Sequence, residues 1–179
     1  MDEEEGRTGK VLASGAALAL GVGLGLGTPA EAATFVVSNL NDSGWGSLRQ
    51  AIADANDAAG ADVITFQAGL TGTITLTSGQ LEINDSVDIQ GPGAEAVTVD
   101  GNNHGCVFYL YSGSDLLDIT LSGLTVAHGR ADQGAGILDW GESLTLDHVT
   151  VRNNAAVGDE GGSGGGIALQ GSTGESAGR

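Results

Sequence analysis

The chain has 179 residues and a formal net charge of −17 at pH 7, which leaves room for one domain and a leader. Such an acidic surface repels DNA, RNA and anionic lipid, so the composition argues against nucleic-acid partners. Cys106 is the only cysteine, which excludes an intrachain disulfide and a cysteine-based zinc site.

The first predicted element is a secretory signal peptide over residues 1–32. An uncharged run rich in alanine, leucine and glycine spans 11–27, and Ala30-Glu31-Ala32 presents the small residues that signal peptidase requires. The run is shorter than the ~20 residues that cross a bilayer, so we expect cleavage after Ala32 and no transmembrane domain in the mature segment. Export would place the protein outside the cell, secreted or on a bacterial cell surface or outer membrane. A retained anchor is the alternative.

Residues 33–60 are expected to form a strand and a capping helix. Thr34–Val37 is apolar enough for a strand, and Ser47 followed by Gln50 has the spacing of a capping box. One apolar face follows at helical spacing: Leu48, Ala51, Ile52 and Ala55. A helix ahead of a strand array would cover the open end of the first coil. An ordinary α+β domain is the alternative, but it leaves the repeat described next unexplained.

Residues 61–170 are expected to form the coils. Asp118–Val126 superimposes on Ser143–Val151 at a shift of 25 residues, and each copy reads as two short strands joined by a bend. A second pair, Gly134–Leu138 and Gly164–Leu169, repeats at a shift of 30. Repeats that contain only strands predict an all-β parallel β-helix, here of about three coils.

Stacked coils place equivalent side chains on top of one another. We expect Ile119 to lie over Leu144 and Val126 over Val151 in the core, and threonine pairs 120/145 and 125/150 to form outward ladders. The inward residues are expected to be Ile119, Leu121, Leu124, Val126, Leu144, Leu146, Val149 and Val151.

Residues 171–179 are of low complexity and offer no second cap. We therefore expect a longer protein whose downstream coils contact the last turn, with a covering partner chain as the alternative.

The segment Gly46-Ser47-Leu48-Arg49-Gln50-Ala51-Ile52, followed by Asp62-Val63-Ile64-Thr65-Phe66, resembles the CSLREAI domain. Gly46 stands at that family's opening Cys and Gln50 at its Glu. The later Gly164-Gly165-Gly166-Ile167 and Val151-Arg152-Asn153-Asn154 resemble repeats of polymorphic outer-membrane proteins, with Val151 in place of their Phe. The resemblance covers residues 34–170 and implies a right-handed, pectin-lyase-like β-helix and export. It implies no activity, because the fold hosts lyases, hydrolases and adhesins.

Lyases of this fold hold Ca²⁺ on acidic residues and use an Arg or Lys to remove a proton from a uronate. The candidates here are Arg130 with Asp132, and Arg152 with Asp147 and Asp159. Calcium needs six to eight converging oxygens, and these acids align only loosely in the repeat. We favour solvated turn and outer-face roles for them, with no catalytic, cofactor or metal site.

Two other constellations carry weaker signals. Asp139 and Glu142 flank Trp140, which suggests either a paired-carboxylate hydrolase with a sugar-stacking ring or a plain coil edge. The histidines lack metal-site spacing and fall at bends or on the surface: His104, His128 and His148. Cys106 is interpreted as a small buried hydrophobe.

We therefore predict a non-enzymatic extracellular or cell-surface β-helix scaffold of adhesin type, with a polysaccharide or a surface receptor as partner. The alternative is a polysaccharide lyase or hydrolase of pectin-lyase-like fold. A third hypothesis is a module stabilised by Ca²⁺; no other cofactor is expected.

Overall fold

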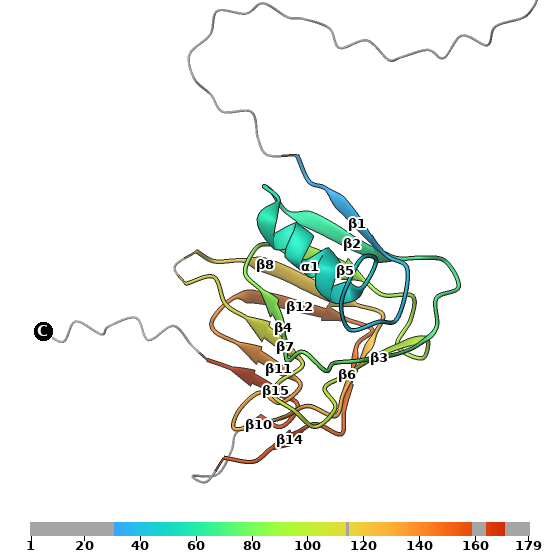
Figure 1. Ribbon diagram of the computed structural model, residues 1–179. Coiled ribbons are helices and arrows are strands. Elements are labelled where there is room, and N and C mark those ends of the chain that lie inside the picture. Colours follow the sequence, from blue (N-terminus) through green and yellow to red (C-terminus); the bar gives the residue numbers. More distant parts are fainter. Residues whose placement is uncertain (1–30, 114, 159–163, 171–179) are drawn as a thin grey trace, which may run out of the picture.

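The computed structural model describes residues 31–113, 115–158 and 164–170. Parallel strands stack turn upon turn, so the chain forms the expected parallel β-helix (Figure 1). The first sheet contains β1 (Thr34–Val37), β2 (Asp62–Phe66), β5 (Val87–Gln90), β8 (Asp118–Ser122) and β12 (Ser143–Asp147). The second contains β3 (Gly72–Thr75), β6 (Val97–Asp100), β9 (Thr125–Ala127) and β13 (Thr150–Arg152).

The third sheet contains β4 (Leu81–Ile83), β7 (Phe108–Leu110), β11 (Ile137–Asp139) and β15 (Ile167–Leu169). A corner pair joins β10 (Arg130–Ala131) to β14 (Ala155–Ala156). The first sheet is five strands deep, so the solenoid has about five turns and the expected count of about three was too low. The turn that begins at β5 is lengthened by the loops 91–96 and 111–117, which hide its register in the sequence.

The predicted stacking is confirmed strand by strand. Ile119 pairs with Leu144, Val126 with Val151, and the shift of 30 pairs β11 with β15. Inward side chains of the middle turns are buried, because alternate residues of a strand face the core. The last turn differs: Leu146 stacks on Leu121 but stays 37% exposed, since no described residue lies beneath it.

The threonine ladders are only partly as expected. Thr120 pairs with Thr145 and Thr125 with Thr150. Thr125, however, is buried, and its hydroxyl donates to the carbonyl of Ala94 at 2.7 Å. The loop 91–96 therefore covers the second sheet at this turn and interrupts the outward ladder.

Equivalent bends share one backbone conformation. His148 (φ 53°) stands where the previous turn has Gly123 (φ 57°), and Asn153 (φ 56°) where it has His128 (φ 55°). All four residues lie in the left-handed region, which few non-glycine residues adopt. These two histidines are thus turn residues, as the sequence alignment predicted.

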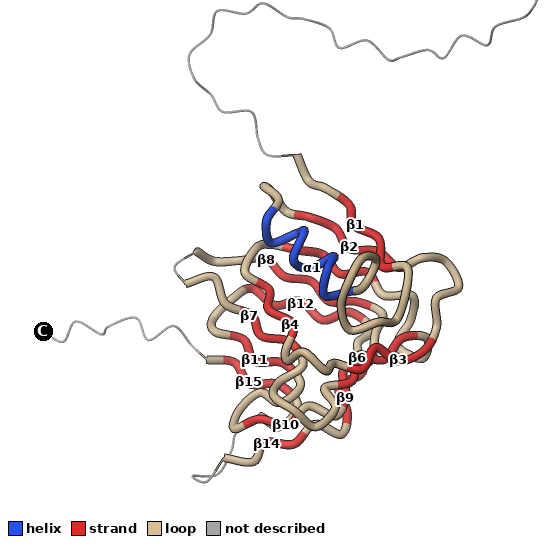
Figure 2. The backbone as a smooth tube through the Cα atoms, in the orientation of Figure 1, coloured by secondary structure: helices blue, strands red, loops and turns tan. Residues whose placement is uncertain are grey.

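The helix α1 (Leu48–Asp57) covers the first turn and packs against β1, β2 and β4. Figure 2 shows it in blue across the end of the stacked strands. Its buried residues are the four predicted from the apolar spacing: Leu48, Ala51, Ile52 and Ala55. The capping box is half formed, because the Ser47 hydroxyl accepts from the Gln50 amide whereas the Gln50 side chain donates to Asp54.

Arg49 fastens this cap to the first turn. Its guanidinium donates to the carbonyls of Gly79 and Gln80 and pairs with Asp42 at 2.7 Å. The other carboxylate oxygen of Asp42 accepts from the backbone and hydroxyl of Thr77. The arginine of the Ser-Leu-Arg motif therefore joins the loop before the helix, the helix and the loop after β3.

Several predictions fall on other parts of the chain. The leader in residues 1–30, Asp159 and the tail 171–179 lie outside the described residues. Within the described part, no helix has the length and apolarity to cross a membrane.

Candidate functional site

Three aromatic side chains form a patch on the outside of the third sheet. Phe108 and Leu110 of β7 face the core, so Tyr109 between them faces outward. Tyr111 follows β7 and Trp140 follows β11, and the pairing of these strands brings the two residues into neighbouring positions. We call Tyr109, Tyr111 and Trp140 the aromatic patch.

The rings of the aromatic patch contact one another in sequence. The centroids of Tyr109 and Tyr111 are 6.1 Å apart, and those of Tyr111 and Trp140 are 6.4 Å apart in an edge-to-face arrangement. Tyr111 is 46% exposed and Trp140 47% exposed. Burial, with further contributions from Tyr111 and Glu82, raises the pKa of Tyr109, which keeps its hydroxyl neutral. The patch offers neutral rings with accessible faces or edges.

A cleft of about 170 Å³ adjoins the patch. Tyr111, Trp140 and Glu142 line it together with the loop 112–116. Glu142 shapes this loop: one carboxylate oxygen accepts from the backbone and hydroxyl of Ser112, and the other accepts from the backbone of Leu117 at 2.9 Å. The cleft is thus held open by a carboxylate whose oxygens both have backbone partners.

The second carboxylate beside Trp140 is also structural. Asp139 is buried, and its Oδ1 accepts from the backbone N–H groups of Gly141 and Glu142 at 3.1 and 2.8 Å. Burial raises its pKa. Asp139 and Glu142 therefore support the turn that carries Trp140, and the structure gives the paired-carboxylate hydrolase hypothesis no free pair of acids.

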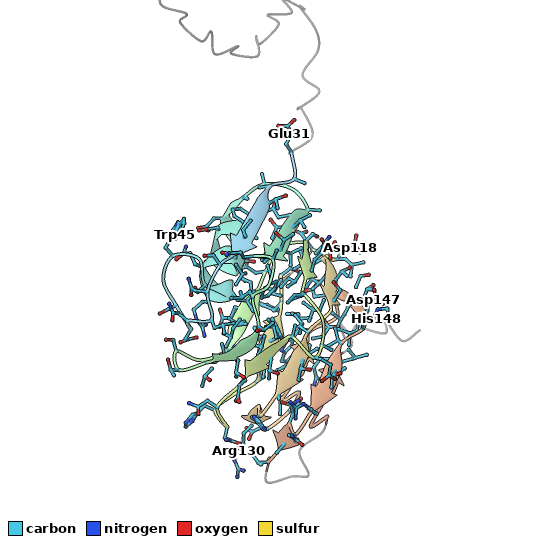
Figure 3. All side chains as sticks on the ribbon, turned by 90° about the vertical axis from the view of Figure 1, so that its right-hand side faces the viewer. Glu31, Trp45, Asp118, Arg130, Asp147 and His148 are labelled. Carbon is cyan, nitrogen blue, oxygen red and sulfur yellow. The ribbon has the colours of Figure 1, made fainter. Side chains whose placement is uncertain are left out.

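The lyase candidates lie elsewhere and are spread over the surface. Arg130 lies on the corner strand β10, Asp132 just after it, and Arg152 on the second sheet; all three are exposed. Asp147, at the end of β12, is exposed and contacts His148 at 2.5 Å. Figure 3 shows Arg130 at the lower end of the molecule and Asp147 with His148 on a side face well above it.

No arginine–carboxylate pair joins these candidates in the described ranges, where the ion pairs are Arg49–Asp42, His128–Asp100 and His148–Asp147. The same part of the chain holds no cluster of three His, Cys, Asp or Glu side chains placed to bind a metal ion. Catalytic roles for Arg130, Arg152, Asp132 and Asp147, and binding of Ca²⁺, therefore stay predictions without a shared site.

Two features were missed in the sequence. Tyr109 and Tyr111 are 31 and 29 residues from Trp140, and the matching signal was the equivalence of Phe108-Tyr109-Leu110 with Ile137-Leu138-Asp139. Asp100 accepts from or donates to His128 Nδ1 at 2.8 Å according to the ring's tautomer. Only the pairing of β6 with β9 brings that aspartate near the bend.

Cys106 is buried, as predicted, and its thiol donates to Gln80 Oε1 at 3.0 Å. Burial raises its pKa to about 11, so the thiol is protonated at neutral pH and a poor nucleophile.

The parallel β-solenoid and one comparison with known proteins agree with a pectin-lyase-like β-helix. The chain is 32% identical over 123 residues, 65% of its length, to proteins called probable pectate lyase C in Aspergillus flavus and in Aspergillus oryzae. It spans about a quarter of the length of these curated relatives, 26% in each case. No family model and no solved structure matches the chain, so the resemblance to the CSLREAI domain stays a prediction.

Proposed function

We propose that this chain is part of an extracellular parallel β-helix that binds polysaccharide on the aromatic patch and displays that surface on a stiff scaffold without cleaving the ligand. The observation that carries the proposal is the convergence of three of the four Tyr and Trp residues in the chain beside one cleft. Aromatic rings provide large, rigid apolar surfaces with polar edges, which suit the apolar faces and hydroxyl rims of sugar rings.

The charge around the patch selects among polysaccharides. Glu82 pairs with Tyr109 across the third sheet, Glu142 lines the cleft, and the whole chain carries a net charge of −17. A polyuronate would meet repulsion from like charges within a Debye length, about 8 Å at physiological salt. We therefore infer a neutral polysaccharide as the ligand class, with a surface receptor glycan as one source of such a polymer.

The first prediction concerns Trp140. Trp140→Ala should weaken binding to a neutral polysaccharide by about tenfold or more, because it removes the outermost ring of the patch. Affinity electrophoresis in gels containing soluble neutral polysaccharides, including xyloglucan and galactomannan, measures the effect.

Trp45 supplies the matched control, because it is the other Trp of the chain, is 90% exposed and lies at the capped end (Figure 3). Trp45→Ala should retain binding within about twofold, a difference small on the affinity scale. Loss of binding in Trp45→Ala but not in Trp140→Ala, or no retardation by any neutral polymer, would contradict the proposal.

The second candidate function is polysaccharide cleavage, which the printed name of the Aspergillus relatives favours. The second prediction is that the chain releases no unsaturated products from polygalacturonate with added CaCl₂, followed by ultraviolet absorbance. Product formation that disappears in Arg130→Ala or Arg152→Ala would replace the scaffold proposal with a lyase.

A further inference from the structure

One carboxylate occupies a core position of the first sheet. Asp62 opens β2, is 1% exposed and faces inward. The residues stacked in line with it on the following turns are Val87, Ile119 and Leu144. An acidic side chain thus stands at the head of a column that is otherwise aliphatic.

This buried carboxylate is incompletely satisfied. Its Oδ1 accepts from the backbone nitrogen of Ala33 at 2.7 Å. Its Oδ2 is fully buried and has no donor within the described residues. Burying a carboxylate with a single amide donor is costly, and a cation with several donors offsets that cost far better than a neutral amide.

The nitrogen that contacts Asp62 belongs to the first residue after the predicted signal-peptidase site. In the intact chain it is an amide with one hydrogen and no charge. When a signal peptidase hydrolyses the Ala32–Ala33 bond, water supplies the oxygen of the new Ala32 carboxylate and the nitrogen of Ala33 becomes an amine. That amine takes up a proton at neutral pH and becomes an ammonium with three donors.

We propose that Asp62 is the binding site for the α-ammonium group of Ala33, and that removal of the leader creates a buried ion pair that fastens β1 onto the solenoid. The ammonium keeps the contact with Oδ1 and supplies the donor that Oδ2 lacks. Ala33 is already held in place, because its carbonyl accepts from the Val63 amide at 2.9 Å. The inference rests on the leader in residues 1–32 and is independent of the carbohydrate ligand.

The scissile bond is accessible in this arrangement. Glu31 and Ala32 are exposed, whereas Ala33 is half-buried. Figure 3 shows Glu31 beyond the end of β1, clear of the stacked strands. A protease can therefore reach the bond, and only the product end is drawn against the solenoid.

The sequence offers a direct measurement, because Lys10 is the only lysine. The chain 33–179 therefore contains one primary amine, the α-amine of Ala33, and the chain 31–179 also contains one, at exposed Glu31. Both are treated with an amine-acylating reagent at neutral pH and followed by intact-mass spectrometry. We expect acylation of Ala33 to be at least about tenfold slower than that of Glu31, since an ion-paired ammonium is unreactive. Equal rates would overturn the proposal.

Thermal melts test the stabilisation. We expect the chain 33–179 to melt about 4 °C or more above the chain 31–179, and Asp62→Asn to abolish the difference. Asp88→Asn, on the outward position of β5 that pairs with Val63, is the matched control and should preserve it. A gap that persists in Asp62→Asn, or no gap at all, would overturn the proposal. If Asp62→Asn does not fold, the acylation rates decide.

The whole chain provides the last test. Residues 1–179 are expressed in a bacterium that secretes the protein, and the first residue of the secreted product is identified by N-terminal sequencing. We expect Ala33. A product that begins at any other residue would overturn the proposal, because its ammonium could not reach the position of the Ala33 nitrogen.

Discussion

At the scale of single residues, Arg49 makes the most consequential polar contacts of the capped end. A planar guanidinium can bond two carbonyls and one carboxylate at once, a geometry that a lysine ammonium does not reproduce. Burial alone would raise the pKa of Asp42, but hydrogen bonds from Ser78, Arg49 and Thr77 outweigh it and lower the pKa to about 2. The pair therefore stays ionised over the whole physiological range.

The third prediction follows from this network. Arg49→Ala should lower the free energy of unfolding by about 2–4 kcal/mol, because it leaves the Asp42 carboxylate partly buried without its cation. Urea unfolding measures the loss. Arg152→Ala, which removes an exposed arginine without an ion pair among the described residues, should cost less than about 0.5 kcal/mol.

The same network sets a pH dependence. The folded-state pKa of Asp42 lies below the value of 3.8 for a free carboxyl. Its contribution to stability is therefore fully present above about pH 4 and is lost as the pH falls through about 2. Asp42→Asn should reduce the fall in stability between pH 4 and pH 2. An unchanged acid limb in that variant would show that other carboxylates control it.

At the scale of elements, α1 depends on one side of its predicted capping box. Ser47 is fully buried, and its hydroxyl donates to the carbonyl of Gly44 while accepting from the Gln50 amide. Gln50 returns no bond to Ser47 and instead contacts Asp54 on the exposed side of the helix.

The fourth prediction compares these two residues. Ser47→Ala should cost about 1–2 kcal/mol, because it removes the N-cap and leaves two backbone groups unsatisfied. Gln50→Ala should cost less than about 0.5 kcal/mol. Both values come from urea unfolding, and comparable losses would show that the reciprocal capping box forms in solution.

At the scale of the whole molecule, each turn of the solenoid is stabilised mainly by its neighbours. Ile64, Ile89 and Leu121 form a buried column that runs through consecutive turns, and Leu146 continues it at the end of the described stack. The two leucines occupy equivalent positions but differ in the number of covered sides.

The fifth prediction uses this matched pair. Leu121→Ala should lower the free energy of unfolding by about 2–5 kcal/mol, because it opens a cavity between two packed turns. Leu146→Ala should cost about 1 kcal/mol or less, since its side chain is 37% exposed. Equal costs would mean that another copy or another segment covers the last turn, and sedimentation analysis would separate these cases.

Much of the fold was predictable because its signals are local. Alternation along Asp118–Ser122 and Ser143–Asp147 identifies the inward side chains, and two turns of equal length place identical patterns 25 residues apart. The apolar face of α1 is likewise written in the spacing of its own residues. These features depend on neighbours in sequence, so the sequence alone determined the solenoid, its cap and the pairing of the later turns.

Tertiary structure alone decided the number of turns and the composition of the site. The loops 91–96 and 111–117 change the spacing between turns, and loop length carries no signal in strand alternation. The register of β7 against β11 brings Tyr111 beside Trp140, and that of β1 against β2 places the Ala33 nitrogen on Asp62. Such contacts join residues about 30 positions apart, and only the completed stack of strands determines which side chains meet.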